Sequence, residues 1–252
     1  MRFAVKNTTS LKKVGYVGSL IRLDFDYLVI SNEDFDVDSL VDTISFFHSI
    51  GIRKFIFTIS YDPLRHTEAW LTDRMKRLKP TLNAYRPRGC SMTLYTDTVH
   101  SSGVPHGIHS YRRLCVPHSS SIFIRLSPFG DPSQIDPDLN ELCFARKCRP
   151  ICTAFEDNIR TCEPDWIRRM MASRSLCFAM DLNFMTATDS EPLMRHAIAQ
   201  DCRIIPAISH SISNYPGILY RMEAWKEEIG ESNYTKFLRQ IHTTGHQLFF
   251  PS

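Results

Sequence analysis

Strand-like apolar runs alternate with helical patterns along most of this chain, and the alternation restricts the fold more than any other feature of the sequence. The first run is LDFDYLVI at 23–30. A helical pattern follows at 36–51, where apolar residues recur every three or four positions, and a second β-rich run occupies 53–60. Parallel strands joined by helices form such β-α-β units, because a parallel connection must cross over the sheet.

The alternation continues to the end of the chain. Strands are predicted at 90–99, 121–127, 149–154, 176–183 and 202–208, and helices at 67–79, 138–145, 163–173, 190–200, 217–228 and 233–242. Neither GxGxxG nor GxxxxGK[ST] is present. Seven strands without a glycine-rich phosphate loop predict a distorted seven-stranded, TIM-like (β/α) barrel over a single domain, 22–252, which 1–21 precedes as an extension.

In a barrel of this kind, site residues lie at the carboxyl ends of the strands and in the loops that follow them. Applied to the predicted strands, this rule selects a set of candidates without any family knowledge. They are Asp24, Asp26, Ser60, Tyr61, Asp97, His100, Ser127, Ala154, Glu156, Asp181, Asn183, Ser209 and His210.

Composition excludes several classes of protein. The net charge of +3 comes without any block of like charges or basic cluster, which argues against nucleic-acid binding. No apolar stretch is long enough for a membrane span, and the N-terminus lacks the apolar core of a signal peptide. The eight cysteines are therefore expected to be reduced thiols in a cytoplasmic protein.

Two alternative metal sites fit the sequence less well. The spacing Cys143-x4-Cys148-x3-Cys152 lacks the CxxC pairs of common zinc modules. His106 and His109 lie in an irregular stretch, 100–120, without helical geometry. A G-x-S-x-G nucleophile elbow is absent, so serine nucleophile chemistry is not indicated.

Asp24 and Asp26 are two residues apart in the first predicted strand, so their carboxylates are expected to point the same way. Such a pair has two interpretations. It could hold a hard cation, or it could accept hydrogen bonds from arginines and loop amides.

The run LDFDYLVI and the segment that follows it resemble the polymerase-and-histidinol-phosphatase (PHP) superfamily, in particular its bacterial capsule-type tyrosine phosphatases. Proteins of that branch open with D-x-H-x-H-I-L and carry T-P-H-Y-x-P at the end of the second strand. Asp24 matches the first aspartate. Asp26 and Leu28 stand at the two histidine positions, and Ser60 stands at the third, before Tyr61.

The resemblance extends to later segments. RPICTAFEDN is similar to the family's P-V-I-A-H-P-E-R-Y, with Glu156 matched and Ala154 in place of a histidine. FAMDLN is similar to a strand that ends in Q-x-N, which places Asn183. IIPAISHS is similar to S-D-A-H-S, with His210 retained and Ile208 in place of the aspartate. The strand at 90–99 is only loosely similar, with Asp97 beside the position of a metal-bridging glutamate.

The resemblance implies a PHP-type barrel in a bacterial protein. It also implies a cluster of two or three metal ions that activates water against a phosphate ester. Leu28, Ala154 and Ile208 cannot ligate a metal, so most of that cluster is expected to be lost. The mouth of the vacated site would be framed by Asp24, Asp26, Ser60, Arg65, Asp97, Glu156, Asn183 and His210.

Two functions follow from these substitutions. The first is a catalytically degenerate barrel, without a cofactor, that binds or regulates an unidentified protein partner, alone or in a larger assembly. The second is a phosphoesterase with a reduced site, in which one Mn²⁺ or Mg²⁺ is held by Asp24, Asp26 and His210.

Overall fold

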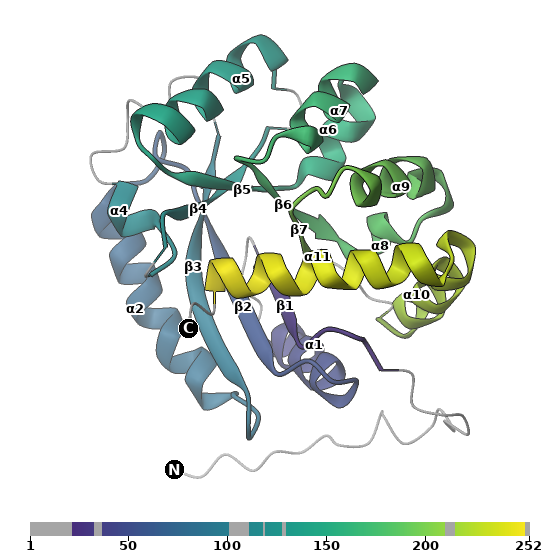
Figure 1. The fold of residues 1–252 in the computed structure, drawn as a ribbon. Helices are drawn as coiled ribbons and strands as arrows, with labels where there is room; N and C mark the ends of the chain where they lie inside the picture. The colour runs from purple at the N-terminus through teal and green to yellow at the C-terminus, as the bar shows by residue number, and fades with distance from the viewer. Residues whose placement is uncertain are drawn as a thin grey trace.

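The computed structural model describes residues 22–32, 37–100, 111–117, 119–127, 130–209 and 215–249, and in them seven parallel strands close into a barrel in sequence order (Figure 1). The strands are β1 (Tyr27–Asn32), β2 (Lys54–Tyr61), β3 (Ser91–Val99), β4 (Ser121–Arg125), β5 (Arg149–Thr153), β6 (Cys177–Asp181) and β7 (Ile204–Ser209). The last strand pairs with the first, which completes the barrel. The predicted fold class is therefore confirmed.

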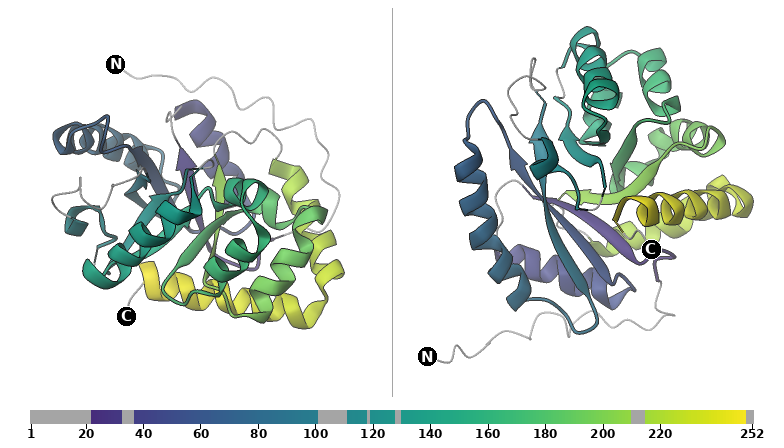
Figure 2. Two further views of the ribbon diagram at one scale, coloured as in Figure 1. Left: turned by 90° about the horizontal axis from the view of Figure 1, so that it is seen from above. Right: turned by 60° about the vertical axis from the view of Figure 1, so that its left-hand side comes forward.

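Helices form an outer layer around the strands, as Figures 1 and 2 show. They are α1 (Val37–Ser49), α2 (Glu68–Ala84), α4 (Tyr111–Leu114), α5 (Pro132–Asn140), η2 (Glu141–Ala145), α6 (Phe155–Thr161), α7 (Pro164–Ala172), α8 (Leu182–Met185), η3 (Thr188–Ser190), α9 (Glu191–Ala199), α10 (Tyr215–Ile229) and α11 (Glu231–Phe249). No helix within the described ranges has both the length and the apolar character that crossing a membrane requires.

The strand register separates inward from outward side chains. Thr96 contacts Met75 of the outer helix α2, at 3.9 Å between Oγ1 and Sδ. Because side chains alternate along a strand, the next residue, Asp97, points into the barrel. Its register partner in β2 is Ser60, and its partner in β4 is Phe123. These pairs place Ser60 and Phe123 on the inner face together with Asp97.

The amino-terminal end of the barrel is closed by aromatic side chains from the strands and from the last helix. Phe249, the last residue of α11, stacks on Tyr95 and Phe123 with ring centroids 6.3 and 6.1 Å apart. The Tyr27 hydroxyl donates a hydrogen bond of 2.8 Å to the carbonyl of Ile241 in the same helix. Polar side chains face inward at the carboxyl end of the barrel. There the Thr58 hydroxyl donates a hydrogen bond of 3.2 Å to the Ser31 hydroxyl.

Strand β1 begins at Tyr27 rather than at the predicted Leu23. The carbonyl of Asp26 accepts hydrogen bonds from the amides of both Arg53 and Lys54, at 2.8 and 2.9 Å, and parallel pairing with β2 starts only after this point. The apolar side chains of Leu23 and Phe25 are buried in the core. Their alternation therefore reflects packing beneath the barrel and not strand structure.

Close packing of α11 on β1 depends on Gly245. A Cβ atom at this position would lie 2.5 Å from the Tyr27 ring, which is itself buried. We expect Gly245→Ala to lower the free energy of unfolding by about 1 to 3 kcal/mol, because the overpacked ring or helix must shift. Chemical denaturation measures the change. Thr243→Ala, on the exposed side of the same helix, is the matched control, and an equally small effect of both substitutions would contradict this packing.

Candidate functional site at the carboxyl end of the barrel

Asp97 is the centre of a buried polar network inside the barrel. Its side chain is completely buried and accepts hydrogen bonds from Thr153 Oγ1, at 2.8 and 2.9 Å to its two oxygens. Arg125 Nε lies 3.2 Å from Asp97 Oδ2 and forms an ion pair with it. Arg125 and Thr153 are register partners at the last positions of β4 and β5. Three adjacent strands therefore contribute one side chain each to this network.

Burial governs the protonation of this network. It raises the pKa of Asp97 to about 7, although the hydrogen bonds from Thr153 oppose the shift. Burial also lowers the pKa of Arg125. The single contact through Nε does not offset the loss of water around the carboxylate, so the net direction for Asp97 is upward.

Glu156 is a second buried acid at the same end of the barrel. It follows Ala154, which has a φ of 54° in the left-handed region and turns the chain from β5 into α6. Glu156 Oε2 is buried and has no hydrogen-bond partner among the residues that the structure describes. Burial raises the pKa of Glu156 to about 7, and the nearby negative charges of Asp181 and Asp157 raise it further. A buried acid of this kind can hold a proton at neutral pH.

A third polar group connects β6 to the outer layer. Asp181 ends β6, and its Oδ1 accepts hydrogen bonds from the backbone amide and the side-chain amide of Asn183, at 2.8 and 2.9 Å. Asn183 Oδ1 in turn accepts a hydrogen bond from Arg221 of α10. Asn183 is thus held in a fixed orientation between two charged groups.

Several predicted site residues are brought together here. Ser60, Asp97, Glu156, Asp181 and Asn183 lie at or just beyond the carboxyl ends of β2, β3, β5 and β6, as the barrel rule predicts. Arg65 also follows β2, but its side chain is 82% exposed and pairs with Asp62 at 3.3 Å. It is therefore a surface residue of the loop.

The structure places Asp24 and Asp26 apart from the other predicted site residues. Both precede β1 and lie at the amino-terminal end of the barrel, opposite the Asp97 network. Asp24 accepts a hydrogen bond of 3.0 Å from the Tyr234 hydroxyl, and Asp26 forms a 2.9 Å ion pair with Lys54. These partners match the interpretation in which the carboxylates accept hydrogen bonds instead of holding a cation.

The match of Leu28 to a histidine position also changes. Leu28 is the second residue of β1 and is completely buried, so it lies away from the carboxyl end. Ser31 and Asn32 occupy that end of the strand instead. Leu28 therefore does not lie where the motif match places it, at the mouth of the barrel.

The histidines divide into described and undescribed positions. His100 Nε2 lies 2.9 Å from Asp138 Oδ2, so this buried histidine has a structural partner. His106, His109 and His210 lie outside the described residues, as does the extension 1–21. Across the part of the chain that the structure describes, no three or more His, Cys, Asp or Glu side chains are grouped so that they could hold a metal ion.

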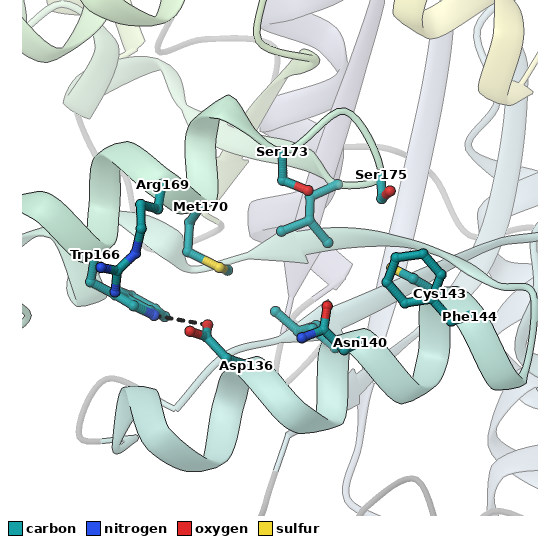
Figure 3. A pocket seen from close by; sticks show the side chains of 11 residues that line it. Asp136, Asn140, Cys143, Phe144, Trp166, Arg169, Met170, Ser173 and Ser175 are labelled. Atoms are coloured by element: carbon teal, nitrogen blue, oxygen red, sulfur yellow. Dashed lines mark hydrogen bonds between the residues drawn. The ribbon is translucent and has the colours of Figure 1, made fainter.

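A separate cavity of about 250 Å³ lies in the outer layer, between α5, η2 and α7. Figure 3 shows Trp166 and Asp136 facing each other across it, joined by a 2.9 Å hydrogen bond from the indole nitrogen. Phe144, on its rim, is 74% exposed. Sequence reasoning did not find this cavity, because its lining comes from helix surfaces that are distant in sequence.

Comparison with known proteins identifies the fold. No family model and no curated protein sequence matches the chain. One solved structure aligns with this chain with a TM-score of 0.60. It comes from work on the crystal structures of YwqE from Bacillus subtilis and CpsB from Streptococcus pneumoniae, which are unique metal-dependent tyrosine phosphatases. The alignment covers 84% of this chain and 89% of that one, at 14% identity. The resemblance to the PHP phosphatases is thereby confirmed at the level of the fold.

A second solved structure is more distant. It is phospho-2-dehydro-3-deoxyheptonate aldolase (DAHP synthase) from Thermotoga maritima, with a TM-score of 0.40 and 11% identity. The alignment covers 81% of this chain and 69% of that one.

Proposed function

We propose that this protein is a PHP-like barrel in which a hydrogen-bonded network occupies the place of a metal cluster, and that it acts as a binding or regulatory protein. The observation that carries the proposal is the pairing of the fully buried Asp97 with Arg125, completed by Thr153. Both carboxylate oxygens of Asp97 accept hydrogen bonds from Thr153, and Oδ2 also contacts Arg125 Nε.

The donor set at the carboxyl end does not fit a cluster of two or three divalent ions. Such a cluster needs several neutral imidazoles and carboxylates that converge on the ions. Besides the Asp97 carboxylate, the inward positions described there carry hydroxyls, at Ser31, Thr58 and Thr153, and a guanidinium, at Arg125. The positive charge of that guanidinium would repel a divalent ion placed beside Asp97.

The same groups suit recognition of a polar partner. Asn183, which accepts a hydrogen bond from Arg221, and the buried acid Glu156 follow the carboxyl ends of β6 and β5. Glu156 Oε2 has no hydrogen-bond partner among the described residues, so its capacity to accept a hydrogen bond is unused. We propose a protein partner that docks a polar segment at this end of the barrel.

Hydrolysis of an aryl phosphate tests the proposal. We expect the purified full chain, supplied with Mn²⁺, to hydrolyse p-nitrophenyl phosphate no faster than the Asp97→Ala variant does. The reason is that no multinuclear centre is available to activate water. Turnover that requires Mn²⁺ and is lost in Asp97→Ala would overturn the proposal.

A phosphoesterase with a reduced metal site is the second candidate function. The observation that favours it is that Glu156 and Asp181 are close enough for the charge of Asp181 to raise the pKa of Glu156, so two carboxyl groups, the ligand type that Mg²⁺ and Mn²⁺ prefer, are neighbours at this end of the barrel. Asp24 and Asp26 cannot join such a site from the opposite end. Turnover abolished by Glu156→Gln but not by Asp26→Ala would identify this second function.

A further inference from the structure

Strand β3 extends past its neighbour β4 and leaves an open sheet edge. It pairs with β2 along 91–98, whereas its pairing with β4 is limited to 97–99. Figure 1 shows β3 continuing away from β4 toward the turn that joins it to α2. Among the residues that the structure describes, no strand pairs with the β4 side of 91–96.

The backbone groups on this edge point away from β2. The amide of Ser91 donates to the carbonyl of Arg53, beside the start of β2, at 2.9 Å. The amide of His100 donates to the carbonyl of Arg125 in β4, at 2.8 Å. In a parallel sheet, the N–H and C=O groups of successive residues point alternately to the two neighbouring strands. The backbone groups of Met92 and Leu94 therefore face the open side, where no strand of the described chain pairs with them.

The residues of the edge do not protect it against pairing with another strand. Natural proteins protect exposed edges with charged residues, prolines or bulges. The sequence SMTLYT at 91–96 contains no charge and no proline, and its threonines and tyrosine favour strand structure. The edge therefore has the properties of a site at which an extended segment adds a strand.

Basic residues border this edge. Between Asp73 and Asp97 the sequence has six lysines and arginines and no acid, although uncharged residues separate most of them. Arg86 and Arg88 are exposed in the turn directly before β3, and neither forms an ion pair within the described part of the chain. This local excess of positive charge is complementary to a partner that carries carboxylates.

We propose that the open edge of β3 is a docking site for an extended acidic segment of a partner protein. The segment adds a strand along 91–96, pairs with the backbone of Met92 and Leu94, and places its carboxylates near Arg86 and Arg88. A peptide fits this edge better than a nucleic acid or an anionic membrane, because phosphates accept hydrogen bonds but do not supply the alternating donors of a strand. A second copy of the chain fits less well, because its own edge carries the same positive charge.

This docking site is separate from the proposed function. The edge belongs to the amino-terminal part of β3, whereas the polar network and the mouth of the barrel begin at Asp97. Either site can therefore fail its test without affecting the other.

Fluorescence anisotropy with a labelled peptide tests the proposal on the full chain. The probe has a core of alternating valines and threonines with glutamates at both ends, so that either strand direction brings carboxylates to the turn. We expect saturable binding that weakens as the salt concentration rises. Two control peptides should not bind. One has lysines in place of the glutamates and is repelled by the arginines, and the other has prolines in place of the threonines and lacks amide donors.

Two pairs of variants separate the contribution of charge from that of strand pairing. Arg86→Glu combined with Arg88→Glu should weaken binding about tenfold. Arg174→Glu combined with Arg239→Glu makes the same change of charge at exposed positions elsewhere and should leave binding unchanged. Met92→Pro removes a donor from the open edge but keeps the ladder with β2, so it should abolish binding, whereas Met92→Ala keeps the amide and should bind like the parent protein.

Hydrogen exchange measured by NMR gives a second readout. In the free protein, the amides of Met92 and Leu94 should exchange faster than that of Thr93, which points to β2, and the peptide should slow the first two selectively. If Met92→Pro does not fold, the arginine variants and these exchange rates still decide the question.

Several results would overturn the proposal. They are the absence of saturable binding, equal binding of either control peptide, and equal binding of an oligonucleotide or of phosphatidylserine vesicles. A dimer of the chain in which the amides of Met92 and Leu94 are already protected would also overturn it.

Discussion

Asp97→Ala is expected to lower the free energy of unfolding by about 1 to 3 kcal/mol at pH 5. The substitution leaves the buried Thr153 hydroxyl without its acceptor and removes the contact between Asp97 and Arg125, whose side chain is 18% exposed. The loss should be smaller at pH 8, because the raised pKa of Asp97 means that its ionised form is costly to bury. Urea denaturation at pH 5, followed by circular dichroism, measures the loss.

Asp26→Ala is the matched control for this prediction. It removes the same carboxylate from an ion pair with Lys54 whose two side chains are 47% and 35% exposed. Exposed pairs contribute at most about 1 kcal/mol, so this variant should remain close to the parent protein. If the two variants lost equal stability, Asp97 would not be the centre of a buried network.

Glu156→Gln is expected to stabilise the protein at pH 8 by about 1 to 3 kcal/mol and to leave its stability at pH 4 nearly unchanged. The pKa of Glu156 is raised from 4.5 to about 7 in the folded protein. The folded state therefore retains a proton that the unfolded state has lost, and the free energy of unfolding falls as the pH rises from about 4.5 to about 7. Glutamine has no charge to bury, so the variant escapes this loss.

Denaturant titrations at several pH values between 4 and 8 measure the effect. Between pH 4.5 and 7, the free energy of unfolding should fall less steeply with pH in Glu156→Gln than in the parent protein. The fall that remains in the variant is assigned to Asp97, whose pKa is also raised to about 7. Glu163→Gln changes the same charge at an exposed position next to α7 and should keep the parent profile. An unchanged slope in Glu156→Gln would show that Glu156 is ionised in water-like surroundings.

The fold was predictable because the barrel depends on local patterns. Each buried parallel strand is an apolar run of five to nine residues, and each crossover is an amphipathic helix, so both periods are visible in the sequence. The start of β1 was not predictable in this way. Leu23 and Phe25 are buried like strand residues, but the ladder with β2 begins only at Tyr27, after the carbonyl of Asp26 has accepted the amides of both Arg53 and Lys54.

The site was predictable only for residues that lie at strand ends. Asp97, Glu156 and Asn183 were found because the barrel rule depends on the order of the strands and not on their pairing. Thr153 and Arg221 were missed, because their roles depend on the strand register and on contacts from α10. Arg125 carried a usable signal: a charged residue ends the apolar run SIFIR, and burying such a group requires a partner.

Leu28 is buried near the beginning of β1, away from the carboxyl end of the barrel. The proposed absence of a metal cluster therefore depends on the Asp97 network and not on Leu28. The proposed loss of a metal cluster rests on the groups in the interior, where Arg125 and Thr153 engage the fully buried Asp97. The central claim therefore concerns what the carboxyl end of the barrel can bind.

Calorimetric titration of the full chain with Mn²⁺ tests that claim most directly. We expect no saturable binding at micromolar concentrations of the ion, in the parent protein and in Asp97→Ala alike, because Arg125 and Thr153 already engage the Asp97 carboxylate. Binding of two or more Mn²⁺ ions per chain, lost in Asp97→Ala but kept in Asp26→Ala, would contradict the account.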